Sequence, residues 1–600
     1  MRASRRVGVR VRVRVAALAA AAVALSACSG QLPTTPEPRP GFPVSVQAPR
    51  NVNIFLTPPQ PGAEPGDIVR GFLRANRGFA DDQDVARRYL TEGLASEWVP
   101  TREVLVYESS PEVALTETGQ VAVTVQVAGR IDAEGRLAEQ TTGTTTTQTF
   151  SLTQVDGEWR ISGFPESFGV WLSRSELQQA FRPTTLYYLN PHGSYFVPEV
   201  RWLALGEGRP TAVARAQLAP LPDYLQGAVR TAASEDVRLS FPSVPVDPAT
   251  HVATVALQGS GLVAGTDPTV ALQSQLAHAL LGLSGVVGVD VQVAGQSLPL
   301  GESDGPITTS TELPYGDLVR DVDVLLLRVG ETFTPVEPDL YALRNLPAEQ
   351  AAGLELPRLG LSWTGVAASA DLRDFAAVSN DRTVLFRWQE GETHRNAGIG
   401  DGLTAPAVDP HGAFWVAGIH RSSSMPWVWV IDRADLRATA RPIDVPWLRE
   451  RDRVRSMSIS PDGSRVVMVI GDSTNERRRL VMAGVVRDGE GRATALTEGV
   501  PVAASLVDIA SARWAAVGDL YLVGRRQEDP RPRAYSLRLG EWLTPIGSAD
   551  SLSPVDLVAV PDGAGARPVA RTADGRFHTP EGSQGWFDAR NGDQLVVPGS

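Results

Sequence analysis

The sequence contains no lysine, so all 56 of its basic residues are arginine. Without lysine there is no P-loop lysine to hold nucleotide phosphates and no Schiff-base lysine for pyridoxal-phosphate or class I aldolase chemistry. A Ser-x-x-Lys acylating serine is excluded for the same reason. Cysteine is almost as scarce. The single residue, Cys28, excludes an intrachain disulfide, a thiolate zinc site and a Cys-x-x-Cys redox pair.

Long apolar runs are also missing. The apolar run Val15 to Ala27 has 13 residues, whereas a helix needs about 20 to span a bilayer. It follows a segment that holds six arginines and no acidic residue, which is typical of a secretory signal peptide. The run ends in Leu25-Ser26-Ala27-Cys28, the pattern at which bacterial lipoproteins are lipidated on the cysteine and cleaved before it. We therefore predict a lipoprotein signal peptide over residues 1–27 and a lipid on Cys28. A plain signal peptide with an incidental cysteine is the alternative.

Removal of the signal peptide changes the charge balance of the chain. Taking its six arginines from the 56 leaves 50 basic against 68 acidic residues, a net charge of −18. A protein with this charge does not attract nucleic acid or anionic lipid through its overall field. We expect no nucleic-acid partner, and we expect attachment to the extracytoplasmic face of the cell membrane to come from the lipid on Cys28.

The chain is predicted to be multidomain, beginning with a tether over residues 28–65. Residues 29–65 carry ten prolines, which remove backbone donors and favour an extended conformation. Residues 66–172 are predicted to form an α+β domain with apolar stripes at helical spacing near Phe72 and from Val85 to Trp98, followed by alternating strands. Helices before a curved antiparallel sheet are typical of an NTF2-like cone, a fold that often contains a pocket.

Residues 183–300 are predicted to form a second α+β domain. Thr266-Asp267-Pro268 joins a capping residue to a proline in the first turn, so we expect a helix from there through Leu280. Val252 to Leu257 and Val286 to Val293 read as strands on either side of that helix.

Residues 335–600 are predicted to form an all-β propeller. Short apolar strands alternate with turns, and nine of the 13 tryptophans lie beyond residue 360. The clearest of the recurring turn-plus-strand elements is Ser460-Pro461-Asp462-Gly463-Ser464-Arg465. Repeats of about 40 residues with four short strands are the mark of a propeller, and about five to seven blades fit the length. A β-sandwich with ordinary hairpin turns is the alternative.

Few residues have the spacing that catalysis or metal binding requires. Gly301-Glu302-Ser303-Asp304-Gly305 matches the Gly-x-Ser-x-Gly elbow of α/β hydrolases, but the elbow needs a following helix and Pro306 comes next. The seven histidines lack the spacing of zinc ligands. His278 is expected at the core boundary of a helix, and His411 in a solvated turn beside Asp409. We expect no catalytic residue, metal or cofactor, with a scattered metal site as the alternative.

Two tryptophans in the predicted propeller alternate with valines. Trp427-Val428-Trp429-Val430 predicts a strand with one tryptophan packed and the other at a blade edge. A sugar-stacking or protein-binding surface is the alternative.

The order of lipobox, proline-rich tether, two α+β domains and propeller resembles the actinobacterial LpqB lipoprotein family over the whole chain. Tyr187-Tyr188-Leu189-Asn190 with the segment 197–203 resembles the opening of that family's GerMN domain. Leu276-Ala277-His278-Ala279-Leu280, with Val286-Val287-Gly288-Val289, resembles its closing helix and strand. The resemblance supplies no catalytic residues.

The resemblance implies a membrane-anchored accessory protein that binds the extracytoplasmic part of an MtrB-like sensor kinase. Such a protein would modulate MtrA–MtrB signalling to cell-wall and division functions. Two other classes stay open. One is a sensor that binds a cell-wall or lipid ligand, and the other is a wall-active hydrolase that uses propeller carboxylates.

Overall fold

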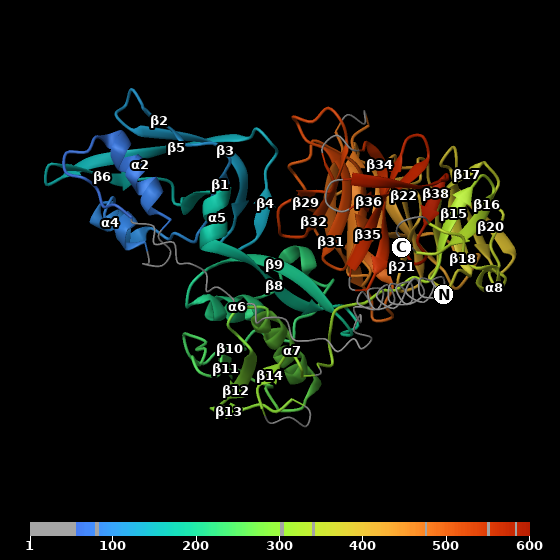
Figure 1. Cartoon of the computed structure of the whole chain (residues 1–600), viewed down its shortest axis with the longest axis horizontal. Helices are drawn as coiled ribbons and strands as arrows, with labels where there is room; N and C mark the ends of the chain where they lie inside the picture. Colours follow the sequence, from blue (N-terminus) through green and yellow to red (C-terminus); the bar gives the residue numbers. More distant parts are fainter. Residues whose placement is uncertain are drawn as a thin grey trace, which may run out of the picture. The chain divides into compact units, whose positions relative to one another are not determined.

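The computed structural model describes residues 56–77, 83–300, 305–311, 313–338, 343–473, 477–548, 552–563, 565–581 and 585–600. The chain is multidomain, with an N-terminal α/β region followed by an all-β propeller (Figure 1). Cys28 and most of the predicted tether lie outside the described residues. No helix in the described ranges is both long enough and apolar enough to cross a membrane.

The first domain packs short helices against a mixed sheet with the strand order β6-β5-β3-β1-β7. Strands β1 and β7 run parallel, while β2 and β4 both pair with β3. The elements are α2 (Pro65–Ala75), α3 (Asp84–Arg87), α4 (Glu92–Glu97), β1 (Val104–Tyr107), β2 (Glu112–Leu115), β3 (Val121–Ile131), β4 (Leu137–Glu139), β5 (Thr145–Val155), β6 (Glu158–Gly163), β7 (Val170–Ser173) and α5 (Arg174–Ala180).

Aromatic side chains fill the interior of this domain. Helix α2 buries Phe72 completely, as its apolar stripe predicts. The Phe72 ring lies 5.2 Å from Trp98, 6.4 Å from Phe150 and 6.0 Å from Phe164, measured between ring centroids. The contact with Trp98 is tilted, that with Phe150 is edge-to-face and that with Phe164 is stacked. These aromatic side chains therefore form the centre of the domain's core.

The second apolar stripe of this domain is not one helix. The sequence predicts a single helical stretch from Val85 to Trp98, and the structure forms α3 and α4 with a break between them. At the break the Ile161 backbone donates to the carbonyl of Tyr89 and accepts from the amide of Thr91. Pairing with β6 thus takes two backbone groups that a continuous helix would need, and it overrides the local helical preference.

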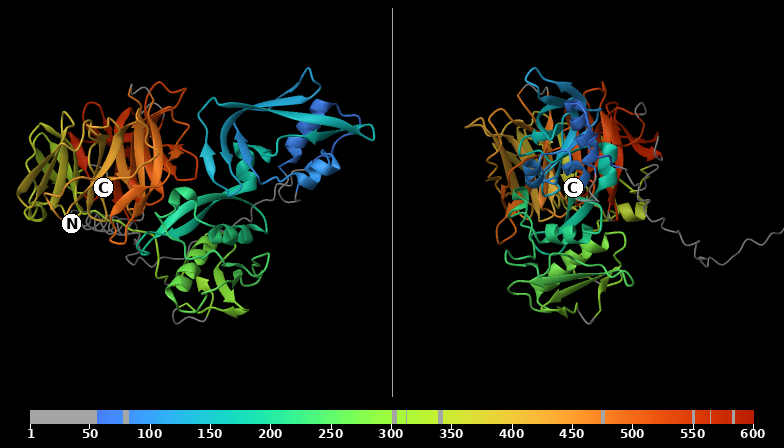
Figure 2. Two further views of the ribbon diagram at one scale, coloured as in Figure 1. Left: turned by 180° about the vertical axis from the view of Figure 1, so that it is seen from behind. Right: turned by 90° about the vertical axis from the view of Figure 1, so that its left-hand side faces the viewer.

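The middle domain has three layers. Figures 1 and 2 show α6 and α7 between a two-stranded hairpin and a separate sheet, and α7 contacts both β8 and β12. As the sequence predicts, Thr266 precedes α7 and proline stands in its first turn. The elements are β8 (Phe181–Leu189), β9 (Phe196–Ala204), α6 (Arg209–Leu218), a 3₁₀ helix (Asp223–Leu225), β10 (Arg238–Leu239), β11 (Val252–Gln258), α7 (Asp267–Leu281), β12 (Gly288–Val293), β13 (Gln296–Ser297) and β14 (Ile307–Thr308).

The propeller has six sheets in the described part of the chain. Five of them use consecutive strands. They are β17 (Trp363–Ala368), β18 (Asp374–Ser379), β19 (Val384–Gln389) and β20 (Glu392–Ala397); β21 (Ala407–Asp409), β22 (Ala413–Ile419), β23 (Pro426–Asp432) and β24 (Arg441–Ile443); β25 (Arg453–Ile459), β26 (Arg465–Gly471), β27 (Arg479–Arg487), β28 (Ala493–Leu496) and β29 (Val500–Val502); β30 (Asp508–Trp514), β31 (Asp519–Arg525), β32 (Arg533–Arg538) and β33 (Thr544–Pro545); β34 (Pro554–Asp562), β35 (Gly565–Thr572), β36 (Arg576–Glu581) and β37 (Gly585–Asn591). A short helix, α8 (Ala348–Ala351), precedes them.

The sixth sheet closes the ring with strands from both ends of the domain. It has the order β16-β15-β38, in which β15 (Leu325–Val329) and β16 (Thr332–Val336) are joined by β38 (Gln594–Val596). The propeller sheets thus begin before residue 335, which is the first residue of the propeller predicted from the sequence. Strands β15 and β16 carry no turn repeat, and the partner that completes their sheet comes from the far end of the chain.

Candidate functional site

The hydrolase-like motif lies mostly outside the described residues, since residues 301–304 are not described. Gly305 is described, and the next regular element after it is strand β14 rather than a helix. A nucleophile elbow needs a helix directly after the serine to strain the turn and expose the hydroxyl. The described part of this segment does not have that form.

The histidines separate into different environments, and two of them meet. His192 Nε2 lies 3.1 Å from His411 Nδ1, although the two residues are 219 positions apart. The prediction that His411 stands in a solvated turn with Asp409 is wrong, because Asp409 is buried and His411 is half-buried. The turn packs under the following blade, where His411 Nε2 lies 3.3 Å from the carbonyl oxygen of Asp462. His278 packs against aromatic rings in the middle domain, as expected for a boundary residue.

A metal would need more ligands than this pair supplies. Among the described residues, no group of three His, Cys, Asp or Glu side chains is arranged to hold an ion. The His192–His411 contact is a hydrogen bond between rings, in which one nitrogen donates and the other accepts. It therefore requires at least one neutral imidazole.

The His411 environment predicts acid sensitivity. Burial lowers the pKa of His411, and the nearby charges of Arg487 and His192 lower it further, while Asp409 acts in the opposite direction. A histidine whose folded-state pKa is lowered contributes stability above its ordinary pKa of about 6.5 and loses it as the pH falls towards the folded-state value. We expect the melting temperature to fall on acidification from pH 7 to pH 5, and to fall less in His411→Gln.

The matched control for this prediction is His394→Gln, which changes a histidine of β20 that is not part of the His192–His411 contact. Melting curves of the two variants and the parent chain, recorded across this pH range, decide the matter. An unchanged slope of melting temperature against pH in His411→Gln would count against the role of this side chain.

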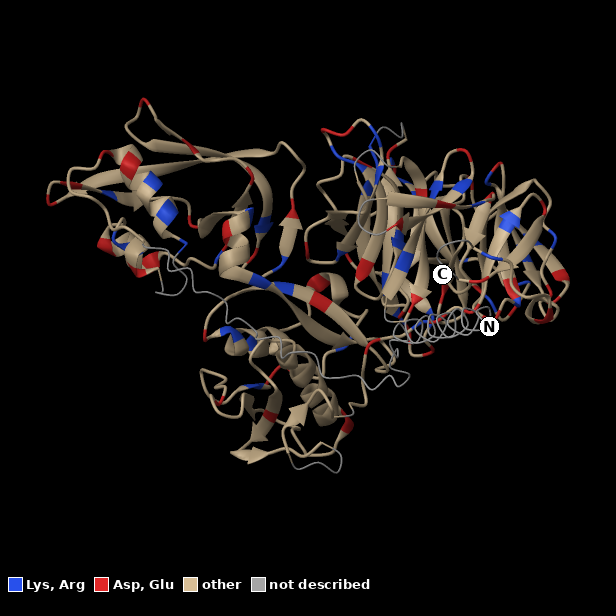
Figure 3. Cartoon of the chain, viewed as in Figure 1, with Lys and Arg blue, Asp and Glu red and all other residues tan. Residues whose placement is uncertain are grey.

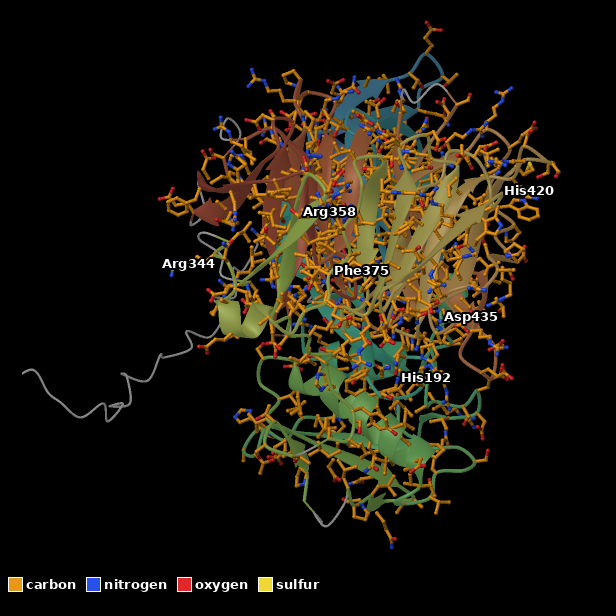
Figure 4. The ribbon with its side chains drawn as sticks, turned by 90° about the vertical axis from the view of Figure 1, so that its right-hand side faces the viewer. His192, Arg344, Arg358, Phe375, His420 and Asp435 are labelled. Carbon is orange, nitrogen blue, oxygen red and sulfur yellow. The ribbon has the colours of Figure 1, made fainter. Side chains whose placement is uncertain are left out.

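The tryptophan pair has the arrangement that the strand pattern predicts. In β23, Trp429 is buried, whereas Trp427 is half-buried and stacks on His420 with ring centroids 3.8 Å apart and ring planes within 5°. His420 is labelled in Figure 4 and lies at the periphery of the propeller. The outward face of this blade thus carries a small aromatic platform.

The propeller has a central cavity lined by residues from all six sheets. Its volume is ≈ 120 Å³. The lining residues are Val366, Ala405, Pro406, Ala407, Ser456, Met457, Ser458, Arg513, Trp514, Asp556, Val558, Ala559, Arg571, Phe577, Gln594, Leu595, Val596, Val597 and Ser600. A cleft that combines apolar walls with a few polar groups is the usual form of a small-ligand site.

Three charged side chains lie in that lining. Arg513 Nη2 is 3.4 Å from a carboxylate oxygen of Asp556. Arg571 stands opposite Asp556 in the register of β34 and β35. Of the two guanidinium groups, only that of Arg513 pairs with the carboxylate. Sequence reasoning missed this group of side chains because the three residues come from different strands of two sheets, and no local pattern links them.

The hairpin β8–β9 packs on the propeller through buried polar contacts. The buried Arg201 guanidinium donates to Glu199 at 2.6 Å, and the Tyr224 hydroxyl donates to the same carboxylate at 2.5 Å. Burial and the Glu199 charge hold the pKa of Tyr224 well above its ordinary value, so its hydroxyl stays protonated. From the propeller side, the buried Arg465 guanidinium donates to the carbonyl oxygens of Pro198 and Val517.

Charge over the rest of the propeller is mixed. Figure 3 shows arginines and acidic residues interspersed along its strands and turns. Pairs such as Arg478–Asp508 at 2.7 Å and Arg567–Asp562 at 2.5 Å account for part of this pattern. Residues 335–600 hold 30 arginines and 34 acidic residues, so most of the net negative charge of the chain lies outside the propeller.

In comparisons with known proteins, an N-terminal and a C-terminal segment of the chain both match domains of one family. Residues 58–178 match the family model described as the N-terminal domain of Lipoprotein LpqB, and residues 348–597 match the model of its β-propeller domain. Lipoprotein LpqB of Cutibacterium acnes is 28% identical over 577 residues, which covers 92% of this chain and 93% of that protein. Lipoprotein LpqB of Thermobifida fusca is 25% identical and covers 90% and 91%.

Among solved structures, TolB from Acinetobacter baumannii is similar at 15% identity. The match covers 46% of this chain and 66% of that one, with a TM-score of 0.26.

Proposed function

The chain belongs to the LpqB lipoprotein family, and on that premise we propose that it is an extracytoplasmic accessory protein of an MtrB-like sensor kinase. The two matched family models together cover more than half of the chain. The observation that carries the proposal is the similarity to proteins named Lipoprotein LpqB over nine-tenths of the sequence. Family membership makes the chain a membrane-anchored lipoprotein. The lipobox supports Cys28 as the anchored residue, and the signal peptide supports the extracytoplasmic side.

In this proposal the chain binds the extracytoplasmic part of the kinase and shifts its signalling, without catalysing a reaction. A kinase that has two conformations responds to any partner that binds one of them more tightly. The three packed domains supply broad surfaces for such binding. The charged side chains of the propeller cavity are two arginines and one carboxylate, which support binding better than they support acid–base or nucleophilic chemistry.

A binding measurement tests the kinase proposal. Purified full chain carrying Cys28→Ser, which removes the lipidation site, is titrated against the extracytoplasmic domain of the kinase. We expect a one-to-one complex of micromolar or tighter affinity, since broad interfaces of about 1,200–2,000 Å² commonly reach that range. In cells, the same variant should move from the membrane to the soluble fraction.

The matched control is the extracytoplasmic domain of an unrelated histidine kinase, for which no complex is expected. Failure of the chain to bind the MtrB-like domain, or equal binding to both domains, would overturn the partner assignment. The anchor is tested separately, because retention of Cys28→Ser in the membrane would contradict lipidation at that residue without affecting the binding result.

A further inference from the structure

The central cavity of the propeller brings several charged groups together. Its described lining contains the side chains of Arg513, Arg571 and Asp556, while the other side chains that line it are uncharged. Ser600, the last residue of the sequence, also lies in the lining and carries an α-carboxylate there.

The two arginines differ in how they are satisfied. Arg513 donates to Asp556 at 3.4 Å and to the carbonyl oxygen of Ala512 at 3.3 Å. Arg571 is half-buried, and its side chain takes part in none of the side-chain hydrogen bonds or ion pairs between described residues, in contrast to Arg513. A guanidinium presents five donors in a planar fork that fits the oxygens of a carboxylate or phosphate. Arg571 therefore has donors to offer to a ligand.

A second polar group without a hydrogen-bond partner lies in the lining of the same cavity. The Ser456 hydroxyl is shielded from solvent and has no hydrogen-bond partner among the described residues, and Ser456 lines the cavity on the inner strand β25. A buried hydroxyl without a partner costs free energy unless a bound molecule satisfies it. Ser456 and Arg571 come from different blades, so both groups can be satisfied at once only by something inside the ring.

The size and field of the cavity select the class of ligand. A volume of ≈ 120 Å³ holds a small group with some water, since one water needs roughly 10–15 Å³ on this scale. The cavity walls combine apolar side chains with polar groups, and the arginines among them attract an anion.

We propose that the propeller cavity is a binding site for a small oxyanion, a carboxylate or phosphate group, which is held by Arg571 and Arg513 with the Ser456 hydroxyl as a further donor. This site is independent of the kinase interaction proposed above. It would make the propeller responsive to a small acidic molecule as well as to a protein partner.

The test is calorimetric titration of the full chain with inorganic phosphate, and separately with malonate, against chloride at equal ionic strength. We expect saturable binding of at least one of the two oxyanions, together with a rise in melting temperature. Binding of phosphate alone or of malonate alone supports the site and identifies the preferred group. Absence of binding for both anions would overturn the proposal.

Variants locate the site. Arg571→Gln should weaken anion binding about tenfold or more, because it removes a charge-assisted contact. The matched control is Arg567→Gln, four residues earlier on the same face of β35, whose guanidinium is already paired with Asp562 at 2.5 Å. Equal affinity in the parent chain and Arg571→Gln would place the anion elsewhere and overturn the assignment.

A measurement on the unaltered chain covers the case in which Arg571→Gln fails to fold. Phenylglyoxal modifies accessible arginines, and mass spectrometry reports the extent at each position. Phosphate or malonate should protect Arg571 and Arg513 while leaving Arg567 as reactive as before. Equal modification of Arg571 with and without the anions contradicts the proposal.

Discussion

Replacing Asp409 with alanine is expected to destabilise the propeller by about 3–5 kcal/mol, the cost of leaving one partner of a buried ion pair without its counter-charge. The Asp409 side chain is 0% exposed and that of Arg487 is 3% exposed, with 2.7 Å between their charged atoms. The same carboxylate accepts hydrogen bonds from the Trp415 indole at 2.9 Å and from the His411 backbone at 2.5 Å. One side chain thus ties the second blade to the third.

After the substitution, Arg487 keeps only its hydrogen bonds to the carbonyl oxygens of Gly463 and Gly491. These neutral acceptors do not replace a carboxylate at the centre of a dry contact. Chemical denaturation followed by tryptophan fluorescence gives the change in free energy of unfolding, because most of the tryptophans lie in the propeller.

The matched control is Glu490→Ala, which breaks the Glu490–Arg492 pair in the turn just after β27. That pair is as short, at 2.6 Å, but its side chains are 68% and 63% exposed. Solvent screens such a pair, so we expect a loss below about 1 kcal/mol. Equal losses in the two variants would show that burial does not set the strength of the Asp409–Arg487 pair. The double change Asp409→Leu with Arg487→Met should recover part of the lost stability, because no charge then remains buried.

Removal of residues 594–600 is expected to open the ring and abolish cooperative unfolding of the propeller. The deletion takes away β38 together with Leu595, Val596 and Val597, which are each at most 4% exposed. Burying one such side chain is worth about 1.5–3 kcal/mol, so the three together approach the total stability of about 5–15 kcal/mol of an ordinary domain.

The deletion also removes two hydrogen bonds between the sixth sheet and the first. The Gln594 side chain accepts from the Val366 backbone at 2.9 Å and donates to it at 2.7 Å, which joins the sixth sheet to the first. Without β38, the edge of β15 that pairs with it in the intact ring is exposed. The shorter deletion of Ser600 alone is the control and should leave the transition intact. A cooperative transition with the same midpoint and slope after removal of 594–600 would contradict the role given to β38.

Sequence reasoning reached the elements whose signals are local. Helix α7 begins where Thr266-Asp267-Pro268 predicts, with proline in its first turn, although the Thr266 side chain makes no capping hydrogen bond. The propeller strand β26 follows from the turn before Arg465, because turns act through neighbouring residues. The split between α3 and α4 could not be predicted, since it depends on backbone pairing with β6, which lies far along the chain.

The candidate site depends even more on contacts between residues far apart in the sequence, which local patterns do not predict. The Asp409–Arg487 pair joins residues 78 positions apart, and the histidine contact joins residues 219 apart. Asp409 and His411 stand in an Asp-Pro-His-Gly turn that resembles a solvated loop, and only the packing of the next blade buries them. The cavity arginines meet because two neighbouring sheets, with inner strands β30 and β34, pack against each other. Composition and spacing contain no signal for such a meeting.

Ring closure by β38 also sets the order of events when the chain folds. Leu327 pairs with Leu595, so nearly the whole propeller lies between two residues that must become neighbours. The entropy of closing so long a loop grows slowly, by about 0.6 kcal/mol for each doubling, so thermodynamics tolerates it. The rate is more affected, because contacts distant in sequence form late. Until β38 pairs, the edge of β15 stays open beside the other five sheets. An open strand edge can pair with other chains, so the folding chain is most prone to aggregate during that interval.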